Sequence, residues 1–563
     1  MKKNFSWKKA VGALVATSVV LSAGIPTSAA SAAEKGTAKN VILMIPDGMG
    51  ASYLTASRIF KGEELSFERY MKGMMKTYSA DTSVTDSAAA GTAMATGYKT
   101  DNGKIAVTPD GKEPSSILDA ARDKDKATGI VATSRITHAT PAVFVSHDAS
   151  RGNEAALAQQ YINNVDLILG GGRDMFTLEK DGGKQTDRDL VAEAKEAGYE
   201  YVTKKSELDS VTGNKVLGLF ADAALTYDID RVNQEEPSLT DMTEFAIDTL
   251  SKDQDGFFLM VEGSQIDWAG HANDPVATVT DMLEFDRAVE KALNFAKKDK
   301  NTLVVVVGDH ETGGMNIGTT EGGYADNIDV LKNIKMSNNV LAAKLAEEAD
   351  VISIANAKES EGNYYLPIRD AAKELGAKFS FNSKSGKATV SLDGTTATID
   401  LLKRTTAVKG ENGRIGIVKT PGVNHVDFQD FTELFGLQAG YQIGDNKADN
   451  KAYVVDAESV LEKHTKLDIN DADLELLTSQ PWDGSTLVNT LGTVISNHAY
   501  ISWGTRNHSG VEIPLYAYGK GSDQFVGLIN NTDLPRIISY LQGTELFEDE
   551  QAFIDQMEER RNQ

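Results

Sequence analysis

The chain has 563 residues, a formal net charge of −25 and no cysteine. The negative charge argues against a nucleic-acid groove and against docking on an anionic lipid surface. The lack of cysteine excludes disulfides, thiolate nucleophiles and sulfur-ligated metals, so any metal must be held by His, Asp, Glu or hydroxyl groups. The length and the 41% hydrophobic content predict a large core and two domains.

The first 33 residues have the composition of a secretory signal peptide. A segment with four lysines (2–9) precedes an apolar stretch (10–25), and small residues follow to residue 33. This order is typical of signal peptides cleaved near residues 30–33. A membrane anchor is the less favoured alternative, because the apolar stretch is short and contains Ser, Thr and Gly. We therefore expect a secreted protein, extracellular or associated with the cell wall, with no membrane span after cleavage.

Short apolar runs alternate with helical patterns after the signal segment. Runs typical of strands buried on both faces occur at 40–45, 129–133, 165–169, 257–261 and 303–307. Helical patterns lie between them, for example at 116–124 and 279–295. This alternation predicts the α/β class, with a doubly wound, mostly parallel sheet and helices on both faces.

Potential metal ligands follow three of these runs. Asp47 comes after the first run, Glu262 after the fourth, and Asp309 with His310 after the fifth. Because ligands of open α/β sheets bind beyond the carboxyl ends of the strands, these side chains are expected at one edge. Carboxylates gathered there would repel one another unless cations lay between them.

More residues of the same kinds occur later in the chain. Asp267 and His271 are four residues apart, so one helical turn can direct both at one ion. His508 precedes an apolar run at 513–518, and Arg151 follows the second run. Taken singly, each has an ordinary explanation as a turn residue, a surface histidine or a surface ion pair. Jointly, their types suit two oxygen/nitrogen zinc sites and one harder oxygen site.

A single serine leads a run of small residues at 85–97. The pattern predicts that Ser87 lies in the first turn of a tightly packed helix, where unpaired backbone N–H groups stabilise anions. A hydroxyl at that position could attack phosphorus. The alternative is ordinary helix capping.

In their order along the chain, these motifs closely resemble those of the bacterial alkaline phosphatases. The matching segments are 46–50, 85–89, 140–142, 151, 261–263, 267–271, 309–310 and 508–510. The resemblance covers about residues 38–320 and 485–545. It implies a hydrolase that cleaves small-molecule phosphate monoesters through a phosphoserine and releases inorganic phosphate. It implies no nucleic acid as a dedicated partner and leaves a homodimer open.

The resemblance also implies two zinc sites and one magnesium site, with Asp47 as a bridge between the second zinc site and the magnesium site. One zinc would be held by Asp267, His271 and His508. The second zinc would be held by Asp47, Asp309, His310 and the oxygen of Ser87. The magnesium would be held by Asp47, Thr140 and Glu262.

Four residues are expected to face the substrate. By the resemblance, Arg151 would bind two phosphate oxygens, and Asp86 would help to hold it in place. His138 and Trp268 depart from the enterobacterial pattern, which has Asp and Lys at these positions. If His138 ligates the third metal, the preference of that site shifts from magnesium towards zinc or cobalt. Alternatively, His138 hydrogen-bonds a water of that site.

Residues 350–460 have a different character. A helical pattern at 368–376 runs into strand-like segments at 378–381, 388–392 and 396–401, and a second helical set spans 428–436. These patterns predict a small α+β domain inserted into a discontinuous catalytic domain of residues 34–349 and 461–563. The insertion is similar to the N-terminal domain of copper amine oxidases, but it has no copper-ligand spacing, so we expect no metal there.

Two other functions are consistent with parts of this pattern. A phosphodiesterase of the same superfamily would make less use of Arg151, because a diester offers fewer free oxygens. A non-enzymatic surface-binding protein acting through the insertion would have no need of an intact set of metal ligands. The sequence therefore favours a phosphate-monoester hydrolase.

Overall fold

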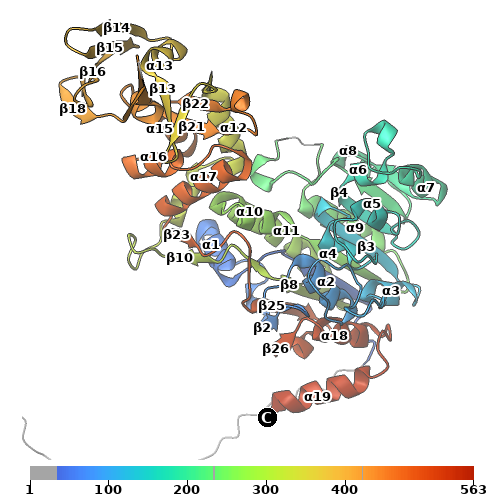
Figure 1. Ribbon diagram of the computed structural model, residues 1–563. Coiled ribbons are helices and arrows are strands. Elements are labelled where there is room, and N and C mark those ends of the chain that lie inside the picture. Colours follow the sequence, from blue (N-terminus) through green and yellow to red (C-terminus); the bar gives the residue numbers. More distant parts are fainter. Residues whose placement is uncertain (1–34, 233–234, 421, 563) are drawn as a thin grey trace, which may run out of the picture.

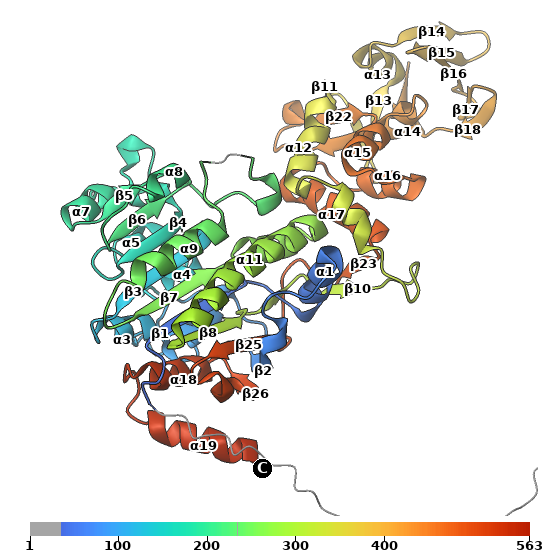
Figure 2. The ribbon, with the colours of Figure 1, turned by 180° about the vertical axis from the view of Figure 1, so that it is seen from behind.

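The computed structural model describes residues 35–232, 235–420 and 422–562. The expected signal peptide, residues 1–33, lies outside these ranges. No helix among the described residues combines the length and the apolar character needed to cross a bilayer. The larger part of the molecule is built around one ten-stranded sheet (Figures 1 and 2).

The order of the ten strands places the earliest strand of the chain near the middle. From one edge to the other the strands are β26 (Gly527–Asn530), β2 (Met71–Lys76), β25 (Ile513–Gly519), β8 (Thr302–Val307), β1 (Asn40–Ile45), β7 (Phe257–Glu262), β3 (Ala127–Arg135), β4 (Leu167–Gly171), β6 (Val216–Leu219) and β5 (Glu200–Val202). From β8 to β5 all neighbours are parallel, whereas β25 is antiparallel to both β8 and β2. The mostly parallel sheet confirms the predicted fold class.

Hydrophobic cores cover both faces of this sheet. Alternate side chains of β1 point to opposite cores, with Ile42 in one and Val41 in the other. The first core is closed by α1 (Ala51–Lys61), α9 (Leu239–Leu250) and α11 (Pro275–Asp299). The second is closed by α2 (Ser87–Thr96), α3 (Ile117–Arg122) and α18 (Asp533–Gln542). The helices therefore lie on both faces, as a doubly wound sheet requires.

The third expected strand is displaced along the chain. The apolar pattern predicts a strand at 165–169, whereas β4 spans Leu167–Gly171. Its two final glycines allow close backbone packing, because a Cβ on Gly171 would lie 2.1 Å from the carbonyl oxygen of Ala223. The strand therefore extends to residues that an apolar pattern does not mark.

Between α12 (Asn338–Glu348) and α15 (Ala457–Thr465) the chain forms three small antiparallel sheets. Their strands are β11 (Asp350–Ser353), β22 (Lys451–Val455) and β21 (Gln438–Gln442); β12 (Lys358–Ser360), β13 (Asn363–Pro367), β20 (Val423–Asp427) and β19 (Ile417–Thr420); and β14 (Lys378–Asn382), β15 (Lys387–Leu392), β16 (Thr395–Asp400), β17 (Thr405–Val408) and β18 (Glu411–Arg414). With helices α13 (Ile368–Glu374) and α14 (Phe428–Glu433) they enclose a third core. This part projects away from the large sheet (Figure 1), consistent with an inserted domain.

Candidate metal and phosphate site

The side chains that follow the central strands meet at one edge of the large sheet. Asp47 follows β1, Glu262 is the last residue of β7, and Asp309 follows β8. Because β8, β1 and β7 are adjacent and parallel, their carboxyl ends lie together. All three carboxylates are buried. Three acidic side chains are therefore buried close together at this edge of the sheet.

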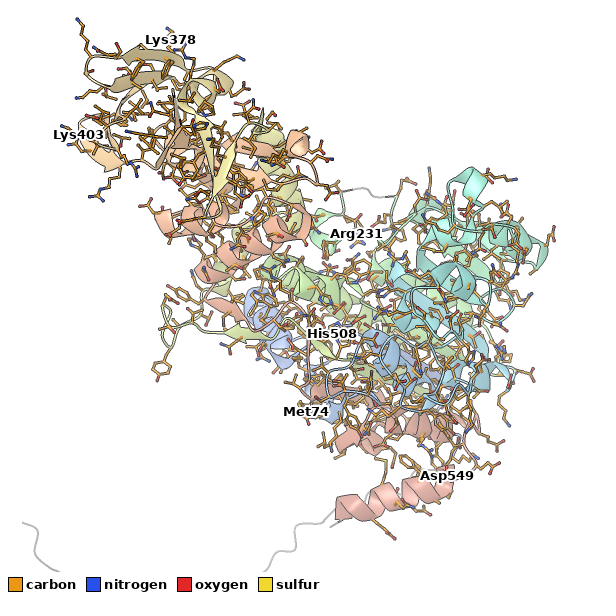
Figure 3. All side chains as sticks on the ribbon, viewed as in Figure 1. Met74, Arg231, Lys378, Lys403, His508 and Asp549 are labelled. Atoms are coloured by element: carbon orange, nitrogen blue, oxygen red, sulfur yellow. The ribbon has the colours of Figure 1, made fainter. Side chains whose placement is uncertain are left out.

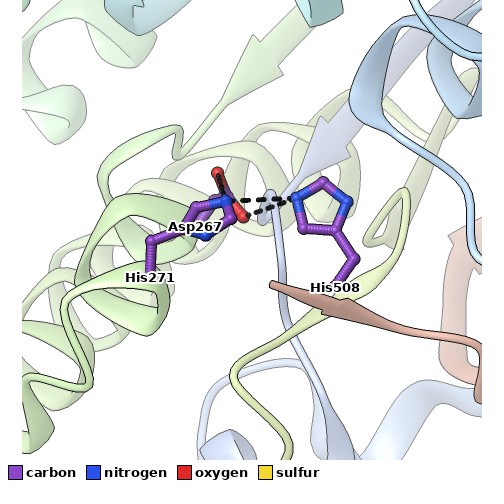
Figure 4. Close-up of side chains that lie close together, drawn as sticks. All are labelled: Asp267, His271 and His508. Carbon is purple, nitrogen blue, oxygen red and sulfur yellow. Dashed lines mark hydrogen bonds and ion pairs between the residues drawn. The ribbon is translucent and has the colours of Figure 1, made fainter. Parts of the chain in front are cut away.

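The first group of ligands joins two distant segments of the chain (Figure 4). Asp267 and His271 are on α10 (Gln265–His271), and His508 is on the two-residue strand β24 (His508–Ser509). The Nε2 of His271 lies 3.4 Å from Asp267 Oδ2, and that of His508 lies 3.5 Å from Asp267 Oδ1. The two Nε2 atoms are 3.2 Å apart.

Backbone carbonyls fix the hydrogens of these two histidines. His271 Nδ1 lies 2.6 Å from the carbonyl oxygen of Arg506, and His508 Nδ1 lies 2.8 Å from that of Thr85. Because a carbonyl only accepts, each Nδ1 carries a hydrogen, and in the neutral form of the two rings the Nε2 lone pairs point towards each other. Two lone pairs facing each other beside a carboxylate form a donor set suited to a cation.

The second group lies around His310, which follows β8. Its Nε2 is 3.5 Å from Asp47 Oδ1, 3.2 Å from Asp309 Oδ2 and 3.1 Å from Ser87 Oγ. Among the described residues, Asp47 Oδ1 and Asp309 Oδ2 are buried without a hydrogen-bond donor. The rings of His310 and His508 stack with centroids 3.5 Å apart, so the two groups are neighbours.

Ser87 is the first residue of helix α2, as the sequence predicts. The side chain of Asp86 caps this helix by accepting a hydrogen bond from the backbone N–H of Ala89 at 2.9 Å. The hydroxyl of Ser87 is therefore buried at the positive end of the helix dipole, beside the second group of ligands.

A third, all-oxygen group shares Asp47. The hydroxyl of Thr140 donates to Asp47 Oδ2 at 3.2 Å, and Glu262 Oε1 is buried without a donor among the described residues. Burial, together with repulsion from neighbouring carboxylates, raises the pKa of Glu262 to about 8 and that of Asp309 to about 6. The same causes raise the pKa of Asp47 well above its usual value. A bound cation would keep these groups ionised at neutral pH.

Arg151 is held from two sides. Its guanidinium donates to Asp86 Oδ2 at 3.0 Å and to His138 Nε2 at 3.1 Å. Because a guanidinium has no lone pair to offer, His138 Nε2 must accept and its hydrogen is on Nδ1. Burial, assisted by Arg151, lowers the pKa of His138 to about 4, so the ring is neutral. The half-buried Trp268 packs edge-on against His138 with ring centroids 5.5 Å apart.

Thr312 belongs to the site but is not among the residues identified from the sequence. Its hydroxyl donates a hydrogen bond to Asp267 Oδ1 and lies 3.3 Å from His310 Nδ1. It therefore connects the first group of ligands with the second. Its position two residues after His310 was the only available signal in the sequence.

Comparisons with known proteins identify the family of this chain. The family model for alkaline phosphatase matches residues 38–401 and 430–544. Alkaline phosphatase 3 of Bacillus subtilis is 35% identical over 546 residues, covering 94% of each chain. Alkaline phosphatase 4 of the same organism is 34% identical over 550 residues, covering 93% of this chain and 95% of the relative.

Solved structures of similar proteins have the same fold. A cold-active alkaline phosphatase from Shewanella has a TM-score of 0.64 at 29% identity, covering 89% of this chain and 99% of that one. The enzyme from the Antarctic bacterium TAB5, solved also as a histidine-to-glutamate variant with magnesium in its M3 site, has a TM-score of 0.54 at 26% identity, covering 91% and 99%. The chain belongs to the alkaline phosphatase family of metal-dependent phosphate-monoester hydrolases.

Proposed function

We propose that this alkaline phosphatase acts through a phosphoserine at Ser87, with two zinc ions and one magnesium ion, and releases inorganic phosphate. The observation that carries the proposal is the position of the Ser87 hydroxyl, 3.1 Å from His310 Nε2 within the buried group of ligands. Because Asp86 caps this helix, capping does not explain why the Ser87 hydroxyl lies beside buried carboxylate oxygens that lack donors.

The donor sets support the choice of ions. Asp267, His271 and His508 offer one oxygen and nitrogen set, and Asp47, Asp309, His310 and Ser87 offer another, both suited to zinc. Asp47, Thr140 and Glu262 offer only oxygens, which suits magnesium. When bound, zinc acts as a Lewis acid that favours the ionised form of a nearby hydroxyl and polarises the phosphoryl group.

The chain's own groups then perform the transfer. Ser87 Oγ attacks phosphorus in line with the departing oxygen, and water later attacks the phosphoserine from the opposite side. The planar guanidinium of Arg151 binds two non-bridging oxygens of the phosphoryl group. Asp86 and His138 hold that guanidinium from either side, so little side-chain entropy is lost when phosphate binds.

His138 bears on the identity of the third ion. Its Nε2 accepts from Arg151, and its Nδ1 carries the hydrogen. Ligation of zinc or cobalt by His138 would require it to release Arg151. We therefore assign magnesium to the third site.

Two further assignments belong to this proposal. Residues 1–33 direct export and are removed, which places the enzyme outside the membrane. Residues 350–460 are an inserted α+β domain, supported by their separate core and by the antiparallel pairing of β11 with β22, where the chain enters and leaves.

Hydrolysis of an aryl phosphate tests the mechanism. The wild-type protein loaded with zinc and magnesium should hydrolyse it, and both chelator and Ser87→Ala should abolish turnover. Acid quenching of the wild type followed by intact mass measurement should detect one added phosphoryl group, absent from Ser87→Ala. A matched Ser391→Ala variant in the insertion should behave as wild type. Turnover by Ser87→Ala, or no turnover by the loaded wild type, would contradict the mechanism.

A diester substrate tests the choice of reaction. Arg151→Ala should lower kcat/KM for a monoaryl phosphate by about a hundredfold, which corresponds to loss of charge-assisted hydrogen bonds worth nearly 3 kcal/mol. A wild-type enzyme that prefers a bis-aryl phosphate over the monoaryl phosphate would instead identify a phosphodiesterase.

A further inference from the structure

The five-stranded sheet β14–β18 and its flanking turns carry positive charge in a strongly acidic chain. The whole chain has a net charge of −25, but residues 378–420 contain more basic than acidic side chains. The eight basic residues are Lys378, Lys384, Lys387, Lys403, Arg404, Lys409, Arg414 and Lys419, and the three acidic ones are Asp393, Asp400 and Glu411. This sheet is at the part of the molecule furthest from the large sheet (Figure 1).

The positive charge is concentrated at one end of this sheet. The strand register aligns Asn382, Lys387, Asp400, Thr405 and Arg414 in one row across all five strands. The turns 383–386 and 401–404 extend beyond this row at the same end, and Leu401 N donates to the carbonyl oxygen of Gly386 at 3.1 Å. We name as the basic end the five cations that this arrangement brings together: Lys384, Lys387, Lys403, Arg404 and Arg414.

None of these five side chains forms an ion pair among the described residues, although Asp400 in the same row attracts Lys387 and Lys403 at longer range. All five are exposed. The acid in the same row, Asp400, accepts hydrogen bonds from the backbone of Leu402 at 3.1 Å and Lys403 at 3.0 Å.

The opposite end of the same sheet is electrically balanced. Lys378 begins β14 and Glu411 begins β18. Asp393 lies in the turn between β15 and β16, and Lys409 in the turn between β17 and β18. The two ends of the sheet therefore differ in charge. Five cations and one acid lie at the basic end, whereas two cations and two acids lie at the opposite end. Mutual repulsion of like charges at the basic end is relieved when an anion binds.

We propose that the basic end binds a linear phosphodiester polymer and so attaches the enzyme to it. Lys387 and Arg414 are three strands apart, a span of about 14 Å from strand spacing, which suits a chain of charges better than one small anion. Arginine forks such as those of Arg404 and Arg414 match phosphate oxygens. Salt-sensitive, long-range attraction of this kind raises the local concentration of a polyanion.

Other anionic partners fit the basic end less well. No aromatic residue occurs in the turns 383–386 and 401–404, and Phe381, 47% exposed, is on the face of the sheet opposite Lys387, so bases of a nucleic acid would find no stacking surface beside these cations. Leu402, 69% exposed, is the one large apolar side chain exposed in these turns, too little to enter a bilayer. Figure 3 places Lys403 and His508 in well-separated parts of the molecule, so attachment would leave the catalytic edge free.

Binding of the full-length enzyme to immobilised poly(glycerol phosphate) tests the proposal. The test variant is Lys384→Gln/Lys387→Gln/Lys403→Gln/Arg404→Gln, and the matched control from the balanced end is Lys378→Gln/Lys409→Gln. We expect the test variant to bind at least tenfold more weakly than the wild type. The slope of log K against log salt concentration should become less steep by about 3, because four phosphate contacts are lost. The control should bind as the wild type does, and all three proteins should hydrolyse an aryl phosphate equally.

Four outcomes would overturn the proposal. They are no binding by the wild type at low salt, equal weakening in the test and control variants, tighter binding to phosphatidylglycerol vesicles, and tighter binding to single-stranded DNA. The vesicle result would assign the basic end to a membrane, and the DNA result to nucleic acid. Because hydrolysis of the aryl phosphate is measured separately, failure of attachment is distinguishable from failure of catalysis.

Discussion

At the scale of single residues, the site depends on backbone and hydroxyl groups that fix the orientation of the candidate metal ligands. Backbone carbonyls of Arg506 and Thr85 fix the hydrogens of His271 and His508, so that both present a lone pair to the same point. Partners of this kind typically determine the orientation and basicity of metal-ligating histidines. The chemistry of the site is therefore distributed beyond its ligands.

Thr312 provides a test of this outer support. Thr312→Val removes the hydroxyl that donates to Asp267 and lies 3.3 Å from His310 Nδ1, with little change in volume. Metal affinity should fall by about 10–100-fold, the usual cost of losing an outer partner. Competition with a zinc-binding dye measures it, and Thr312→Ser should restore the affinity. Equal affinities for wild type and Thr312→Val would show that the hydroxyl does not support the ligands.

The meeting of the candidate ligands at one edge could be predicted from sequence, because adjacent parallel strands bring the residues that follow them close together. Asp47 and Asp309 both follow buried parallel strands, and such strands end at one edge. The hydroxyl of Thr312 could not be predicted, because its two contacts depend on where α10 lies relative to the chain after β8. The contact between His138 and Arg151 is likewise tertiary, and the sequence left the role of His138 open.

At the scale of elements, the helix that carries Ser87 is fixed by close packing. Helix α2 contacts the short helix α4 (Ala139–Ala142), which carries Thr140. A Cβ on Gly91 would lie 2.9 Å from Val143 Cγ2 and 3.7 Å from Thr140 Cα. The same contact therefore positions the proposed nucleophile, Ser87, and a candidate ligand of the third group, Thr140.

Gly91→Ala tests this packing. Overpacking costs about 1–3 kcal/mol, and the better helix propensity of alanine offsets about 1 kcal/mol. We expect a net loss of about 1 kcal/mol in the free energy of unfolding and a drop in kcat, because Ser87 and Thr140 move apart. Urea unfolding and turnover measure the two effects. In a Val143→Ala background the same substitution should cost less, and an unchanged cost would place the strain elsewhere.

In the insertion, Asp427 combines helix capping with an unfavourable charge. It caps α14 by accepting from the backbone of Gln429 at 3.0 Å and of Asp430 at 3.3 Å. Burial, together with repulsion from Asp430, raises the pKa of Asp427 to about 6. Because the folded pKa is above the unfolded value, the folded state binds the proton more tightly and stability falls as pH rises from about 4 to above 6.

Asp427→Asn should remove this pH dependence while it keeps the cap. We expect the variant to be more stable than wild type at pH 8 by about 1 kcal/mol, after allowance for solvent screening, and equal to it at pH 4. Urea unfolding at the two pH values measures the difference. The exposed Asp393→Asn serves as control and should have no effect, and a stability gain independent of pH would contradict the role assigned to the charge.

Apolar patterns predicted most central strands but misplaced the end of one, and the reason is steric. Apolar patterns located β1, β7 and β8 within a residue, since these strands are buried on both faces. The same reasoning missed the end of β4, where Gly170 and Gly171 continue the strand because the backbone of Ala132 lies against the first and that of Ala223 against the second. Close backbone contact selects glycine, which carries no hydrophobic signal.

At the scale of the whole molecule, the candidate metal ligands lie on the large sheet, whereas the insertion is built around a separate hydrophobic core. The ligands Asp47, Glu262 and Asp309 end three central strands of the large sheet, and the insertion has its own core. The sequence predicted this division from the change in pattern near residue 350. It could not predict the sharp charge polarity of β14–β18, which depends on strand register.

After removal of metal, the protein should therefore unfold in two separate thermal transitions. Ions bound only by the folded large sheet should stabilise it by about 2.7 kcal/mol for each site at a hundredfold excess over Kd, and we expect no ion in the insertion. Calorimetry with chelator should shift one transition to lower temperature and leave a second in place. Asp427→Asn should raise only the second transition at pH 8, which assigns it to the insertion, and added zinc and magnesium should restore the first. A single transition that shifts as a whole would show that the two cores unfold together, because the contacts of α12 with α15 and β22 then couple them.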